Sequence, residues 1–159
     1  MNNKPIIIVA GEPNSVFLEI FFKTKKNYKF KNPIILIASK DLLFKQMKKL
    51  NFNLKVNLIT DTKINLKKLD TKKINLINVD YKFRKVFDKI TDKSNTYINN
   101  TFEIALKILK DNNCAGLING PISKKNFLKE KFLGITEYLA KKTSNKHKVA
   151  MLIYNRNLS

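Results

Sequence analysis

The chain has 159 residues, 43% of them hydrophobic and 28% charged, with a formal net charge of +20. This length suits one domain with a real core, and apolar strings such as Ile6–Val9 and Ile34–Ile37 exclude intrinsic disorder. No apolar run approaches the roughly 18 residues that span a bilayer, and the N-terminus lacks the apolar region of a signal peptide, so a cytoplasmic protein is expected.

One cysteine and one histidine limit the available chemistry. Cys114 cannot form an internal disulfide, which favours a reducing cytoplasm, and its place before an apolar strand predicts a buried, inert thiol. His147 lies between Lys146 and Lys148 without an acidic neighbour, which favours a solvated surface residue over a general base. The sequence therefore predicts no complete metal site, and no catalytic residue is assigned.

The positive charge raises the possibility of nucleic-acid binding, since lysine and arginine neutralise phosphates. However, 30 of the 32 basic residues are lysines, and they are scattered along the chain rather than gathered in one segment. A composition rich in Lys, Asn and Ile is typical of proteins encoded by an A+T-rich genome. Aromatic residues interleave with lysines at Lys26–Lys31, so a basic nucleic-acid-binding module stays open as the least favoured reading.

Six short apolar runs recur at regular intervals and are predicted to be strands. Several are apolar throughout rather than alternating, which is typical of strands buried on both faces of a parallel sheet. The six runs are Pro5–Ala10, Pro33–Ala38, Leu54–Ile59, Ile74–Val79, Ala115–Asn119 and Lys148–Tyr154.

The segments between these runs have helical spacing. Helices are predicted from near Val16, over Asp41–Leu50, over 95–112 with Ser94 as N-cap, and from Ile135 to about Lys142. The stretch from about 60 to 93 is less periodic and rich in lysine, and is expected to contain a loop. Strands alternating with helices predict a single α/β region over residues 1–159, with three layers and a mainly parallel sheet.

Three polar segments are candidate binding places, each expected at the carboxyl end of a strand, where open α/β sheets bind ligands. They are Gly11–Ser15, Asn119–Lys124 and Gly134–Tyr138. In the first two, a helix N-terminus favours an anion, and Lys124 is suited to meet a phosphate or carboxylate. Turn and capping chemistry alone is the alternative explanation for all three. No glycine-rich nucleotide fingerprint is present.

Taken together, these segments resemble the N-terminal half of the 4-hydroxythreonine-4-phosphate dehydrogenase family of pyridoxal phosphate biosynthesis. The family's opening motif G-[ED]-P-A-G-I-G-P-E is matched by GEPNSVFLE at 11–19. Its T-[GA]-P-[IV]-x-K is matched at the end of AGLINGPISK (115–124), and its F-x-G-H-T-E-[FY]-[LF] by FLGITEYL (132–139). A following strand resembles VAML at 149–152.

This resemblance implies an NAD-dependent oxidation and decarboxylation of a small phosphorylated substrate by a homodimer. It implies a fold like that of isocitrate and isopropylmalate dehydrogenases, here incomplete. It also implies a divalent metal that acts as a Lewis acid and is held by three histidines from the later part of the family chain. The family's His-Thr pair binds substrate, which points to Thr136 and Ile135 here, with Lys124 as a further candidate.

Three departures from the family qualify that expectation. Ile135 stands where the family has its substrate-binding histidine and offers no hydrogen bond. Ser15 and Phe17 replace glycines of the first motif. The family chain is about twice as long, so the metal and most cofactor ligands are expected to be absent. We therefore expect a truncated, inactive N-terminal part of the dehydrogenase, or alternatively a non-catalytic α/β domain that binds a small molecule or phosphate.

Overall fold

The computed structural model describes residues 4–60, 65, 68–111, 114–129, 131–144 and 149–154. The chain divides into two compact units, Met1–Ile122 and Ser123–Ser159. No helix in the described ranges is long and apolar enough to cross a membrane.

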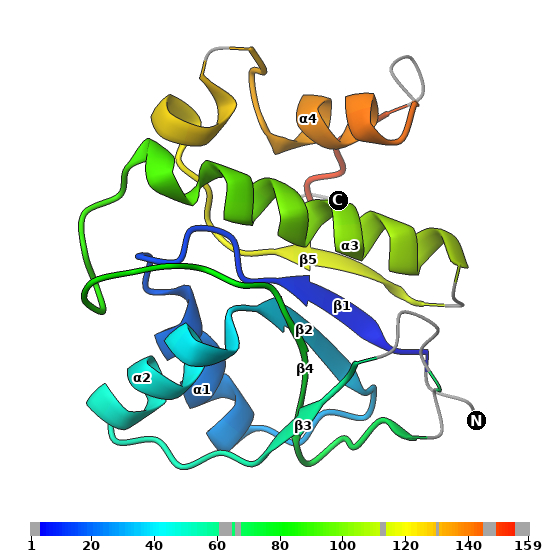
Figure 1. Ribbon diagram of the computed structural model, residues 1–159. Helices are drawn as coiled ribbons and strands as arrows, with labels where there is room; N and C mark the ends of the chain where they lie inside the picture. Colours follow the sequence, from blue (N-terminus) through cyan, green and yellow to red (C-terminus); the bar gives the residue numbers. More distant parts are fainter. Residues whose placement is uncertain are drawn as a thin grey trace. The chain divides into compact units, whose positions relative to one another are not determined.

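The first unit is built on a parallel sheet of five strands in the order β3-β4-β2-β1-β5 (Figure 1). Ile7 of β1 pairs with Ile35 of β2 on one side and with Leu117 of β5 on the other. The parallel α/β fold predicted from the apolar runs is thus confirmed. The strands are β1 (Ile6–Val9), β2 (Ile34–Ala38), β3 (Val56–Leu58), β4 (Ile74–Asn78) and β5 (Gly116–Asn119).

Helices cover both faces of this sheet and give the expected three layers. Figure 1 shows α1 (Phe17–Asn27) and α2 (Lys40–Lys49) on one face and α3 (Asn95–Asp111) on the other. The Ser39 hydroxyl caps α2 by accepting a hydrogen bond from the Leu42 N–H at 3.4 Å. The helices α1, α2 and α3 begin within one residue of their predicted starts.

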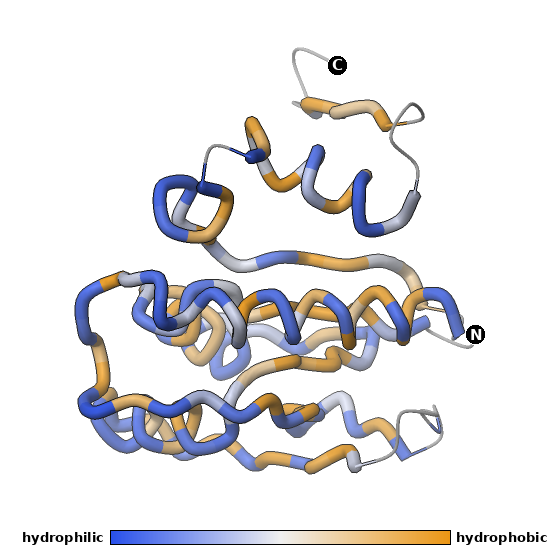
Figure 2. The backbone as a smooth tube through the Cα atoms, turned by 45° about the horizontal axis from the view of Figure 1, so that its top comes forward, coloured by the Kyte–Doolittle hydropathy of each residue, from blue (hydrophilic) through white to orange (hydrophobic). Residues whose placement is uncertain are grey.

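The core lies where the apolar helix stripes meet the strands. On the face covered by α1 and α2, Ile8 and Leu36 pack with Phe22 and Leu43. Alternate strand residues such as Ile7 are also buried and point to the opposite face, because successive side chains of a strand alternate. Each such fully buried side chain contributes about 1.5–3 kcal/mol relative to exposure. Figure 2 shows the strands as hydrophobic and the helices as alternating between hydrophobic and hydrophilic residues.

The second unit contains a five-residue π-helical turn, η3 (Lys124–Leu128), and the helix α4 (Ile135–Lys142). The ring of Tyr138 lies at its centre, 5.2 Å from the Phe127 ring and 5.5 Å from the Phe132 ring, both edge to face. These contacts join the turn to the helix. The predicted helix over 135–142 is confirmed.

The strand predicted over Lys148–Tyr154 is wrong over its described part. Residues 149–154 form neither strand nor helix, and the side chains from Met151 to Tyr154 are at least 71% exposed. An apolar run becomes a strand only when a neighbour completes its backbone ladder, and the described sheet ends its pairing with β5. Lys148 lies outside the described residues.

Candidate functional site

The first two predicted segments meet at one edge of the sheet, because they follow the adjacent parallel strands β1 and β5. The Glu12 N–H donates to the Pro121 carbonyl at 2.8 Å, and the Gly120 N–H donates to the Val9 carbonyl at 2.7 Å. The two chains approach so closely that a Cβ on Gly120 would lie 2.2 Å from the Ala10 carbonyl oxygen. Gly11, at φ +73°, is equally restricted.

A buried carboxylate occupies the turn after β1. Glu12 is only 3% exposed, and its Oε2 accepts a hydrogen bond from the Ser94 hydroxyl at 2.8 Å. Its Oε1 accepts from the Asn14 N–H at 3.3 Å. Ser94, predicted as the N-cap of α3, ends the short 3-10 helix Asp92–Ser94 that leads into α3, and its hydroxyl also donates to the Thr91 carbonyl at 3.0 Å. Because a carboxylate already faces the amides of this turn, the structural explanation of the first segment is favoured over an anion site.

Tyr97 of α3 reaches the end of β2 in the same region. Its hydroxyl oxygen accepts a hydrogen bond from the Ser39 N–H at 3.1 Å, and the side chain is 4% exposed. Burial raises the pKa of Tyr97 well above its usual value, and the nearby charges of Tyr81 and Glu12 act in the same direction. From the sequence this contact could not be predicted, since the partners are 58 residues apart.

The three predicted substrate residues all lie in the second unit. The Ser123 hydroxyl accepts a hydrogen bond from the Asn126 N–H at 3.1 Å and so caps the turn η3, which begins at exposed Lys124. Ile135 and Thr136 are the first two residues of α4 and are half-buried. The third segment thus follows a helical turn rather than a strand, which corrects its expected position.

The boundary between the two units falls inside the second predicted segment. Gly120 belongs to the first unit, where it packs against the turn after β1, whereas Lys124 belongs to the second. The aromatic contact between Phe127 and Tyr138 ties the turn that carries Lys124 to the helix that carries Thr136. The predicted segments therefore lie in two places. One is the end of the sheet where Gly11 and Gly120 pack together, and the other is the second unit, which contains Lys124 and Thr136.

A pocket that sequence reasoning missed opens in the first unit, beside the turn after β1. Its volume is about 440 Å³, and the loop between β4 and α3 supplies most of its lining. Asn14 joins that loop to β1, because its Oδ1 accepts from the Asp88 N–H at 3.2 Å and its Nδ2 donates to the Lys89 carbonyl at 3.4 Å. The lining residues are Asn14, Tyr81, Lys82, Phe83, Arg84, Asp88, Lys89, Thr91 and Lys93.

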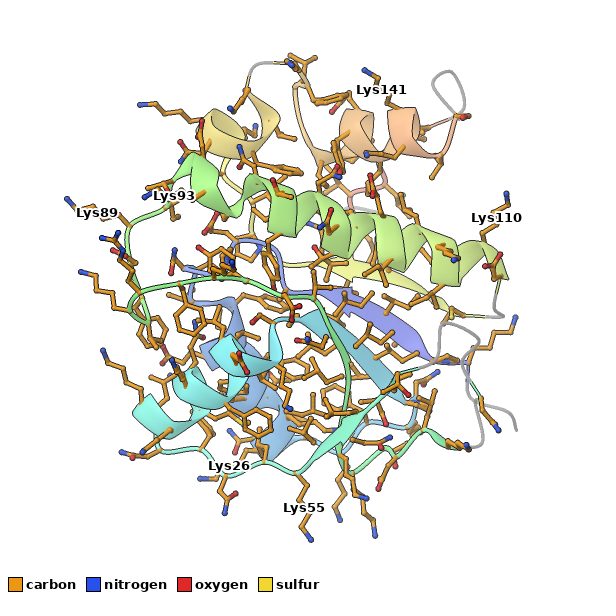
Figure 3. All side chains as sticks on the ribbon, viewed as in Figure 1. Lys26, Lys55, Lys89, Lys93, Lys110 and Lys141 are labelled. Carbon is orange, nitrogen blue, oxygen red and sulfur yellow. The ribbon has the colours of Figure 1, made fainter. Side chains whose placement is uncertain are left out.

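The only sequence signal for this pocket was the aperiodic, lysine-rich stretch that predicted a loop. Figure 1 shows this segment at the edge of the sheet where β1 ends, and Figure 3 shows Lys89 and Lys93 on that side. The other labelled lysines of the first unit, Lys26, Lys55 and Lys110, project elsewhere.

The described residues do not fit a metal centre, since no three His, Cys, Asp or Glu side chains among them are gathered so as to hold an ion. His147 lies outside the described residues. Cys114 is half-buried rather than buried as predicted, and burial raises the pKa of its thiol, which disfavours the reactive thiolate.

Comparison with known proteins identifies the family. The sequence model of the pyridoxal phosphate biosynthetic protein PdxA matches residues 29–159. The chain belongs to this family. The matched range contains Lys124 and Thr136 but not the segment at 11–19, where Ser15 and Phe17 replace two of the family's glycines. A search of curated protein sequences finds no match.

Solved structures of the same family share the fold. A 4-hydroxythreonine-4-phosphate dehydrogenase from Burkholderia phymatum superposes with a TM-score of 0.76 at 16% identity, over 89% of this chain and 44% of that one. The enzyme of the same name from Klebsiella pneumoniae gives a TM-score of 0.72 at 16% identity, over 89% and 45%. This PdxA-family chain thus spans less than half the length of these structures.

Proposed function

We propose that this chain is the N-terminal, substrate-binding part of an NAD-dependent 4-hydroxythreonine-4-phosphate dehydrogenase, acting in the cytoplasm as a homodimer. Such an enzyme oxidises the hydroxyl of the phosphorylated substrate and releases its carboxylate as carbon dioxide. The observation that supports the proposal is that Lys124 and Thr136 fall within the family match and within one compact unit.

The roles of these residues follow from their chemistry. Thr136 stands in the first turn of α4, and its hydroxyl can both donate to and accept from a substrate oxygen. The exposed ammonium of Lys124 is suited to a phosphate oxygen, to which it offers a charge-assisted hydrogen bond. Ile135 replaces the family's histidine and contributes only apolar contact.

NAD and a divalent metal are implied by the family. When bound, these groups would supply a Lewis acid for the substrate hydroxyl and an acceptor for the hydride. His147 is the only histidine of the 159 residues, so three metal-binding imidazoles have no counterpart in them. We therefore assign this chain substrate binding without turnover on its own, with the metal and most cofactor contacts supplied from outside these residues.

Substrate affinity tests this assignment. Calorimetric titration with 4-phosphohydroxy-L-threonine should give measurable binding that Thr136→Ala weakens about fivefold, in keeping with the loss of one hydrogen bond. Thr143→Ala is the matched control, because Thr143 lies just past the same helix and its hydroxyl donates to the Leu139 carbonyl at 2.9 Å. Ile135→His should strengthen binding. Failure of both the wild type and Ile135→His to bind would contradict the proposal.

Turnover separates this proposal from a full enzyme. The chain incubated with the substrate, NAD and a divalent metal should produce no NADH. Metal-dependent NADH formation that Thr136→Ala abolishes would show that these residues suffice for catalysis and would refute the assignment.

The presence of Ile135 also favours a second candidate function, a non-catalytic domain that binds a small molecule or phosphate. The two candidates differ in specificity. A domain that retains only phosphate recognition should bind inorganic phosphate as well as the substrate, whereas a dehydrogenase part should prefer the substrate.

A further inference from the structure

The pocket between the turn after β1 and the loop before α3 contains a concentration of unpaired positive charge. Lys82, Arg84, Lys89 and Lys93 line it together with a single carboxylate, Asp88. Asp88 already lies 3.6 Å from the Lys85 ammonium. Among the residues that the structure describes, none of the four lining cations forms an ion pair. Unpaired cations around one concavity focus a positive potential into it, which attracts anions.

Two aromatic side chains in the lining of this pocket add apolar surface to the charge. The rings of Tyr81 and Phe83 lie 6.0 Å apart with 14° between their planes, and both side chains are half-buried. Tyr81 packs on the buried Tyr97 ring at 5.0 Å. Apolar surface beside cations is the combination that holds a ligand with one charged and one apolar end.

Several contacts hold the loop in place, so that the pocket exists before a ligand arrives. Asn14 makes the two hydrogen bonds to Asp88 and Lys89 described above. From α2, the Lys45 ammonium lies 4.9 Å from the Phe83 ring and the Lys49 ammonium 5.7 Å from the Phe87 ring. Phe87 itself adopts φ 60°, a conformation that a bulky residue takes only when its surroundings impose it.

We propose that this pocket binds a small organic phosphate, whose phosphate meets Arg84, Lys89 and Lys93 and whose ring packs against the half-buried side chains of Tyr81 and Phe83. Arginine offers a paired set of donors that matches a phosphate, and the lysines add point charges. The volume of about 440 Å³ suits a monocyclic phosphate ester. None of the lining residues is among those that the family resemblance assigns to the substrate, and the proposal does not rest on the proposed function.

Phenyl phosphate is the probe that tests the proposal, with inorganic phosphate as its ring-free counterpart. Calorimetric titration of the whole chain at low salt should give an affinity for phenyl phosphate several-fold higher than for inorganic phosphate. The double variant Lys89→Gln/Lys93→Gln should weaken phenyl phosphate binding about tenfold, as expected from the loss of two nearby charges. Phe83→Ala should remove the preference for the ring and leave the affinity for inorganic phosphate within about twofold.

The matched control is Lys26→Gln/Lys110→Gln, which removes the same charge from exposed positions away from the pocket (Figure 3). It should change the affinity less than twofold. Equal weakening by both double variants would show general charge attraction and overturn the proposal, as would equal affinities for the two probes. A single-stranded oligonucleotide that outcompetes phenyl phosphate would point to a nucleic-acid surface instead. Thr136→Ala should leave phenyl phosphate binding unchanged, which separates this test from that of the proposed function.

Discussion

The close approach of β1 and β5 makes Gly120→Ala the sharpest test of how this site is built. The added Cβ would lie 2.2 Å from the Ala10 carbonyl oxygen and 2.8 Å from its carbon, both backbone atoms that cannot swing aside. Relief requires the two strand ends to separate, which strains the hydrogen bonds from Gly120 to Val9 and from Glu12 to Pro121.

The magnitude follows from these terms. Overpacking of this kind costs about 1–3 kcal/mol, and weakening two hydrogen bonds costs about 1 kcal/mol more. Reduced freedom of the unfolded chain offsets about 0.4–1 kcal/mol. The free energy of unfolding should therefore fall by about 1–4 kcal/mol, a large share of the roughly 5–15 kcal/mol typical of a domain.

Gly116→Ala is the internal control, because nothing lies within 4 Å of a Cβ at Gly116. Urea unfolding followed by far-ultraviolet circular dichroism should show Gly116→Ala unchanged or slightly more stable. Gly11→Ala should lose at least as much as Gly120→Ala, because its Cβ would lie 2.3 Å from the Pro121 oxygen at φ +73°. If Gly120→Ala proved as stable as Gly116→Ala, the strand ends would not meet as described.

Four further outcomes are expected. Tyr97→Phe should lower the free energy of unfolding by about 1–3 kcal/mol, since the buried Ser39 N–H loses its acceptor. Because the pKa of Tyr97 is raised on folding, the contribution of this residue to the free energy of unfolding should be fully present below about pH 10. That contribution should be lost as the pH rises further, so urea titration at each pH should show a steeper loss of stability for the wild type than for Tyr97→Phe. Ser94→Ala should destabilise by about 1–3 kcal/mol in the same assay because Glu12 then loses its hydroxyl donor; an unchanged midpoint would contradict this. The purified chain should self-associate in sedimentation, or otherwise melt below 60 °C, because exposed sheet edges favour pairing between chains. A monomer that melts cooperatively well above 60 °C would contradict this expectation.

Local pattern determined much of this protein. Continuous apolar runs such as Ile34–Ala38 predicted buried parallel strands, because a strand covered on both faces has no polar side. Helical spacing predicted α3, and the motif containing Thr136 indicated the family that the comparison confirms. These signals are carried by residues close in sequence, so a single sequence was enough to show them.

Tertiary structure alone decided what those segments meet. The hydroxyl of Ser94 donates to Glu12, 82 residues away, because the start of α3 packs beside the turn after β1. The apolar run at 149–154 had the pattern of a strand, but it has no ladder in the described sheet. The pocket likewise depends on Asn14 bonding to Asp88, 74 residues away. Contacts of this separation leave no periodic trace, because they depend on where the chain returns rather than on its local pattern.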